Sequence, residues 1–299
     1  MAQPSRFYLA RVVKRGELTK ERIVDAMREP AIIELRGTRY SFTDFRAFDQ
    51  SGPESGFYAK IAKYRQQGAV SVVREERHES AEAQVRNLID ASSAFVYLPD
   101  YSGLAYRHIW NALPRDRFER VFKALVEFKY VLAGCDIDPI VDLRTFVTRL
   151  SRLEKITELE ASVAPPNPLF GPCWRSLSDY VRKRKLTEVQ IKEQADHGIE
   201  TRIREIAEAV LMHPTDSERA LEMMEPLLGG VGDAALLMAA DGYGRAKVRG
   251  NESDREVVIR TSENQKSFQL DGDPDPELLY QRALAAFRQT SQERGLEHA

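Results

Sequence analysis

The sequence predicts an α+β fold in which antiparallel hairpins and sheets pack with helices, and a helical segment occupies the middle of the C-terminal half. Two observations carry this prediction. Short β-type segments flank turn-forming residues, as at Gly37-Thr38 and at residues 99–103, which is typical of antiparallel hairpins. Other segments place apolar residues at helical spacing, so that each would bury one stripe.

The N-terminal half alternates between these two kinds of segment. A proline ends the first helix, and Pro114 suits the first turn of the second. Strands are expected at residues 6–13, 31–36, 39–48, 57–65, 69–74, 94–98 and 104–109, helices at 20–28 and 115–132, and residues 75–90 fit either pattern.

Residues 141–168 form a compact unit near the middle of the chain. Its first part has the apolar stripe of a helix, and residues 156–163 then change to the period of a strand. Prolines follow and end the strand, because proline lacks the N–H that a ladder needs. We place a domain boundary in this seam, between residues 1–168 and 169–299, with a single domain as the alternative.

The C-terminal half is predicted to be helical first and β later, with one closing helix. Helices are expected at residues 171–186, through most of 187–213, at 217–228 and at 277–289, and strands at 234–239, 244–249, 256–261 and 267–270.

The net charge, the cysteine count and the length of the apolar runs exclude several classes of protein. With 44 Lys and Arg against 46 Asp and Glu, the net charge is −2, so an anion-binding surface requires segregated charge. Two cysteines without a CxxC argue against a disulfide scaffold or a zinc cluster and suit a reducing cytoplasm. We find no apolar run long enough for a signal peptide or a membrane span.

Motifs for nucleotide or hydrolase chemistry are missing. The sequence contains no P-loop, no dinucleotide-binding GxGxxG after a strand, no HExxH and no GxSxG. Its histidines are scattered without the spacing of metal ligands. The sequence therefore predicts no cofactor and no catalytic residue.

Two groups of cations predict contacts to nucleic-acid phosphates. Four adjacent cations end the helix at 171–186, and alternating cations on the strand at 244–249 share one face, about 7 Å apart. A solvated helix end and the wet face of a sheet are the alternatives. The predicted phosphate-binding residues are Arg175, Arg182, Lys183, Arg184, Lys185, Lys192, Arg245, Lys247 and Arg249.

Acidic residues offer a second hypothesis, a Mg²⁺-dependent nuclease. Asp136, Asp138 and Asp142 lie just before or at the start of the central unit, and Glu158 and Glu160 lie on its strand. Such a site needs paired acids to hold the metal and a nearby lysine to orient water. The lysine expected two residues after a metal-binding acid is missing. Glu160 stands two residues after Glu158, and Ser162 stands two residues after Glu160. A third hypothesis is a non-catalytic subunit that binds a partner protein.

The order of elements resembles that of the RexA-type phage-exclusion proteins and related bacterial abortive-infection proteins. Four segments carry the resemblance: RFYLARVV, AFVYLPDYSGLAYRHI, LEKITELEASVAPPNP and the closing GYGRAKVRGNESDREVVIRTSENQKSF with the helix after it. The resemblance implies a cytoplasmic bacterial defence protein that binds DNA and forms a homodimer. It implies no catalytic residues, so none is assigned.

Overall fold

The structure, a computed structural model, describes residues 4–49, 54–74, 79–165, 175–203, 205 and 230–293. The chain folds as two compact units, each built from segments that are distant in sequence. The first unit joins Met1–Val13, Leu98–Ala105 and Ile137–Ala299, and the second joins Lys14–Tyr97 and Tyr106–Asp136.

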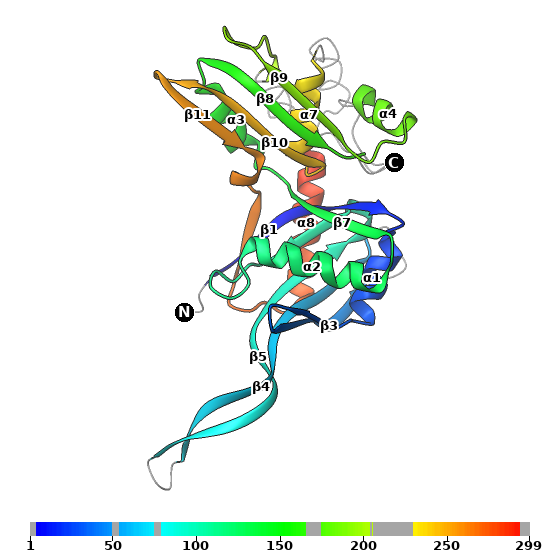
Figure 1. The fold of residues 1–299 in the computed structure, drawn as a ribbon, viewed down its shortest axis with the longest axis vertical. Helices are drawn as coiled ribbons and strands as arrows, with labels where there is room; N and C mark the ends of the chain where they lie inside the picture. The colour runs from blue at the N-terminus through cyan, green and yellow to red at the C-terminus, as the bar shows by residue number, and fades with distance from the viewer. Residues whose placement is uncertain are drawn as a thin grey trace. The chain divides into compact units, whose positions relative to one another are not determined.

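A four-stranded antiparallel sheet forms one part of the first unit (Figure 1). Its order is β11 (Arg255–Arg260), β10 (Gly244–Glu252), β8 (Lys155–Val163) and β9 (Val189–Gln194). β8 and β10 pair in a register that sets Ala246 opposite Ala161 and Val248 opposite Leu159. Because these four side chains are buried, one face of the sheet belongs to a core.

Helix α7 (Val231–Ala240) packs against β8, β9 and β10 and is buried around nearly its whole circumference. Helix α3 (Leu143–Ser151) begins at Asp142, whose side chain accepts a hydrogen bond from the Thr145 backbone N–H. Helix α4 (Arg175–Lys183) adds Leu177 and Val181 to the same core. The helices therefore share the apolar face of the sheet.

The first unit also contains strands from both ends of the chain. β12 (Ser267–Asp271), β1 (Pro4–Gly16) and β6 (Gly103–Tyr106) are neighbours in that order, and β7 (Ala133–Pro139) also pairs with β1. The short helices η1 (Pro99–Tyr101) and η4 (Thr261–Glu263) lie next to strands. Helix α8 (Pro276–Gln292) begins at Asp275 and packs Phe287 against Tyr101, with ring centroids 5.7 Å apart.

The second unit contains an antiparallel run of strands with two helices. The strands are β5 (Glu79–Leu98), β4 (Gly56–Arg74), β3 (Thr38–Phe48) and β2 (Ile33–Leu35), in that order. The helices are α1 (Lys20–Arg28) and α2 (Arg115–Lys129). Phe42 of β3 lies between Phe95 and Phe122, at centroid distances of 5.5 and 5.6 Å. Aromatic residues therefore join strands to α2.

The predicted α+β class is confirmed, and several elements match closely. The first helix occupies the predicted residues, and the central helix–strand unit and the closing helix fall where the sequence placed them. The strands expected at 57–65 and 69–74 form one strand, β4, and the ambiguous residues 79–90 belong to β5.

Two expectations were wrong about the type of element. Residues 234–239 form helix α7, because a run that is buried on all sides lacks the polar face that reveals helical period. Residues 189–194, expected to be helical, form β9, whose alternating exposure is that of an edge strand. The helix expected at 217–228 lies outside the described residues.

The units also divide the chain differently from the expected boundary at residue 168. β8 precedes that boundary, whereas its neighbours β9 and β10 follow it. Hydrogen-bonded ladders thus cross the proline-rich seam, and both sides of it belong to the first unit.

Candidate nucleic-acid interface

The end of α4 carries four successive cations, Arg182, Lys183, Arg184 and Lys185, which we call the basic turn. The helix stops here because Lys185 takes a left-handed conformation, with φ of 54°. Two hydrogen bonds close the turn, from the Lys185 N–H to the Arg182 oxygen and from the Leu186 N–H to the Val181 oxygen. The carbonyls of Val181 and Arg182, in the last turn of the helix, are therefore satisfied by the backbone.

All four side chains of the basic turn are exposed. The Arg184 guanidinium lies 5.6 Å from the centre of the exposed Tyr180 ring. Within the described part of the chain, no ion pair involves Lys183, Arg184 or Lys185. These cations are thus available to an anionic ligand, and an exposed aromatic ring lies beside them.

The cations of β10 share one face of the sheet, as the sequence predicted. Register sets Arg245 opposite Ser162, Lys247 opposite Glu160 and Arg249 opposite Glu158. This polar face is the one turned away from the buried residues Ala246 and Val248. We call the three cations the β10 row.

The acids of β8 neutralise the middle of the β10 row. The Lys247 ammonium lies 2.9 Å from a Glu158 oxygen and 2.7 Å from a Glu160 oxygen. The hydrogen bond from Lys247 holds the pKa of both carboxyls below the ordinary value. The two carboxylates in turn raise the pKa of Lys247. A phosphate would have to compete with both carboxylates for this lysine.

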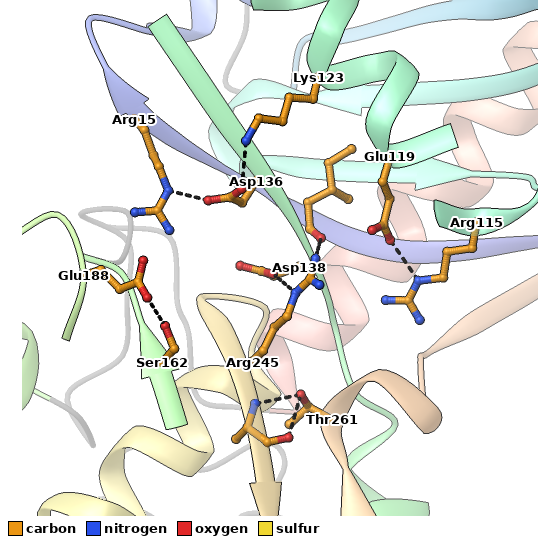
Figure 2. A network of polar contacts seen from close by, with 12 residues as sticks. Arg15, Arg115, Glu119, Lys123, Asp136, Asp138, Ser162, Glu188, Arg245 and Thr261 are labelled. Carbon is orange, nitrogen blue, oxygen red and sulfur yellow. Dashed lines mark hydrogen bonds and ion pairs between the residues drawn. The ribbon is translucent and has the colours of Figure 1, made fainter. Parts of the chain in front are cut away.

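The outer members of the β10 row have acidic partners as well. Arg249 donates to Glu256 over 2.6 Å, between Nη1 and Oε1. Arg245 donates from Nε to the buried carboxylate of Asp138 over 2.9 Å, and from Nη2 to the Ile137 oxygen (Figure 2). The β10 row is therefore part of a charge-balanced surface rather than a bare cationic stripe.

Two further predicted residues lie near these groups in sequence. Lys192 is exposed on edge strand β9, opposite Glu160 of β8. It begins the row of charges that crosses the sheet through Glu160 and Lys247. Arg175 is the first residue of α4, and its side chain lies outside the described part of the chain.

Each aspartate of the nuclease hypothesis interacts with a different partner. Burial raises the pKa of Asp136, but the hydrogen bonds and charges of Arg15 and Lys123 outweigh it, and the net pKa is lowered (Figure 2). Asp138 accepts from Arg245, and Asp142 caps α3. Among the described residues, no three acidic, histidine or cysteine side chains form a group that could hold a metal. These acids thus act as partners of arginine, lysine and backbone N–H groups.

Sequence reasoning missed the pairing of the acidic strand with the basic one. The signal was present, since TELEAS in β8 alternates acids with the period at which GRAKVRG in β10 alternates cations. Opposite charges at matching period favour cross-strand pairing. Reading the two strands together would have predicted that the β10 row is neutralised.

Comparison with protein-family models and with curated proteins identifies no relative. No protein-family model matches the chain, and no curated protein matches it. In the described ranges, every helix is too short or too polar to cross a membrane.

Proposed function

We propose that this protein binds nucleic acid, with double-stranded DNA as its ligand, through phosphate contacts that do not depend on sequence. The observation that supports this most directly is the basic turn, whose Lys183, Arg184 and Lys185 are exposed and form no ion pair among the described residues. Adjacent cations attract a phosphate backbone because binding releases condensed counterions. Lys192, on the strand that follows the turn, extends the proposed interface.

The β10 row has a smaller place in this proposal than the sequence suggested. Its three cations have carboxylate partners at hydrogen-bonding distance, so each phosphate contact there would first have to break an ion pair. Arg245 is the member best placed to rearrange, because its side chain is 60% exposed. We therefore assign the main contacts to the basic turn.

The biological setting that we propose is antiphage defence in the bacterial cytoplasm. It rests on the resemblance to RexA-type and abortive-infection proteins in four segments of the sequence. The same resemblance suggests a partner protein of a defence system. The proposal assigns no catalytic step, because each acid of the nuclease hypothesis already has a basic or backbone partner.

A direct test is a fluorescence-anisotropy titration of a labelled DNA duplex at two salt concentrations. The test variant is Lys183→Gln/Arg184→Gln/Lys185→Gln. A matched control, Arg86→Gln/Arg117→Gln/Arg282→Gln, removes the same charge from three exposed cations on separate elements. If the turn makes three phosphate contacts, its loss reduces the steepness of log Kd against log salt by about 3.

The outcomes separate local from global charge effects. Weaker binding in the turn variant alone, equal for duplexes of different sequence, supports the proposal. Equal weakening in both variants would mean that only net charge matters. Unchanged binding in the turn variant would remove the basic turn from the interface, and failure of the wild type to bind at low salt would overturn the proposal.

A further inference from the structure

The C-terminal end of helix α4 has an exposed side as well as the side that joins the core. Leu177 and Val181, one turn apart, are buried in the first unit. Tyr180 and Arg184 have the same spacing and are both exposed, and the Arg184 N–H donates to the Tyr180 oxygen over 3.2 Å. Side chains four residues apart lie one above the other on a helix. Tyr180 and Arg184 therefore form a pair on the exposed side of α4.

This pair presents planar groups to the solvent. Tyr180 is 48% exposed, and the Arg184 guanidinium carbon lies over its ring, 5.6 Å from the ring centre. This distance is within the range of a cation–π contact, which orients the ring. Nucleic-acid bases stack on aromatic rings and on the planes of guanidinium groups. The pair thus offers two surfaces of the kind that an unpaired base contacts.

The cations beside this ring are available to a phosphate. The last three cations of the basic turn form no ion pair within the described ranges. Phe128, in the last turn of α2, is 68% exposed, but the next residue, Lys129, lies 2.6 Å from a carboxylate oxygen of Glu29. Tyr180 therefore differs from Phe128 in having neighbouring cations that are not paired with a carboxylate.

A fully paired duplex has no base face to offer the Tyr180 ring. The faces of its bases are covered by neighbouring base pairs, so a protein contacts phosphates, sugars and the base edges in the grooves. A single-stranded segment presents its phosphates together with the faces of its bases. Cations beside an aromatic ring are the combination that binds such segments, and stacking tolerates any sequence because every base has a π-face.

We propose that Tyr180, oriented by Arg184, stacks on an unpaired base next to the phosphates that the basic turn binds. This role rests on the proposed function and narrows its ligand. A duplex is bound through its phosphates, and a single-stranded tail adds the contact to a base. The protein therefore prefers DNA with a single-stranded tail to fully paired DNA, whatever the sequence of the tail.

The test is a fluorescence-anisotropy titration of the full-length protein with three labelled DNAs at one salt concentration. The first is a blunt duplex, the second carries a single-stranded thymidine tail, and the third carries a tail of the same length made of abasic residues. The abasic tail keeps every phosphate of the thymidine tail but has no base to stack. The wild type should bind the thymidine tail at least about 5-fold more tightly, the lower end for one base on one aromatic ring.

Three variants test whether one ring causes this preference. Tyr180→Leu keeps an apolar side chain without the ring, so it should bind the thymidine tail and the abasic tail with equal affinity. Tyr180→Phe should keep the preference of the wild type, because stacking needs the ring and not the hydroxyl group. Phe128→Leu, which removes an exposed ring from α2, is the matched control and should also keep the preference. Circular dichroism checks that each variant folds.

The outcomes separate this role from the proposed function. A wild type that binds the blunt duplex without preferring the thymidine tail to the abasic tail would overturn stacking and leave the phosphate contacts in place. The same holds if Tyr180→Leu keeps the preference, or if it loses affinity equally for all three DNAs. Loss of the preference in Tyr180→Phe or in Phe128→Leu would also contradict stacking on the Tyr180 ring. Failure of the wild type to bind any of the three DNAs would overturn the proposed function itself.

Discussion

Lys247 of β10 and Glu160 of β8 face each other across the ladder, with 2.7 Å between the ammonium and a carboxylate oxygen. The same ammonium lies 2.9 Å from Glu158, which is nearly buried. One lysine thus balances two acids on the central strand of the sheet. Its partners make it a structural cation, although its spacing in the sequence suggested a ligand contact.

Replacing this lysine should destabilise the protein at neutral pH. In Lys247→Met, Glu158 and Glu160 face each other without the cation, so like charges repel and a nearly buried carboxylate loses its donor. We expect a lower melting temperature, measured by circular dichroism. Lys192→Met is the matched control, because Lys192 is exposed on the same face at an edge strand.

The penalty of Lys247→Met should shrink in acid. Lys247 lowers the pKa of Glu158 and Glu160 in the folded protein, so their contribution to stability is present above the unfolded pKa, about 4.3 for glutamate. That contribution is lost as pH falls through the folded pKa. Melting temperatures of wild type and variant should therefore converge below about pH 4. A constant difference from neutral to acidic pH would contradict this account.

Gly244 allows β10 to start against β8. A Cβ at this position would overlap the backbone oxygen of Ser162, which belongs to the paired strand and cannot move alone. Gly244→Ala should therefore lower the free energy of unfolding by about 3 kcal/mol or more, measured by urea denaturation. In Gly37→Ala, φ is also positive but no atom lies within 4 Å of the added Cβ, so only about 1 kcal/mol is expected. Equal losses would contradict the steric argument.

Arg11 holds the middle of β1 through buried contacts within the first unit. Its Nε donates to the Asp241 carbonyl over 2.8 Å, its Nη1 donates to the Tyr101 carbonyl, and its guanidinium lies 4.9 Å from the centre of the Tyr243 ring. Arg11→Met would leave two carbonyls without this donor.

We expect Arg11→Met to cost about 2–4 kcal/mol in the free energy of unfolding, because buried acceptors lose charged donors. Arg6→Met, an exposed arginine on the same strand, should cost less than about 0.5 kcal/mol. Urea denaturation of both variants measures the difference. Similar losses in the two would show that the contacts of Arg11 contribute little.

Much of the fold could be predicted from the sequence, because the spacing of apolar residues that identifies a helix or a strand depends only on residues close together in the chain. The helix at residues 20–28 has a capping Thr19 and one apolar face, and β8 has strict alternation before prolines. Helix α7 could not be recognised in the same way, since burial on every side removes the polar stripe. β9 needed its partner β8 to be recognised, because edge pairing depends on residues distant in sequence.

The candidate site shows a similar division. That Arg245, Lys247 and Arg249 share a face follows from the period of a strand, and the sequence was sufficient for it. Their neutralisation by Asp138, Glu158 and Glu256 depends on which strands and turns meet in space. The exposure of the basic turn was a reasonable inference, because four adjacent cations cannot all be buried. The sequence thus identified the clustered cations. Only the pairing of strands and turns in space distinguishes cations that are paired with carboxylates from cations that are available to a ligand.

Cys135 on β7 should be an unreactive thiol in the folded protein. Its side chain is fully buried, and burial, followed by the charge of Glu127, raises its pKa to about 12. The thiolate is the reactive species, so thiol reagents should modify Cys135 of a Cys173→Ser variant at pH 8 only after unfolding. Labelling with a chromogenic disulfide is followed by absorbance at about 412 nm. We expect the rate constant of labelling to be roughly that of global unfolding. Fast native-state labelling, compared with the same variant in urea, would show that β7 opens locally and that the thiol is not protected by the core.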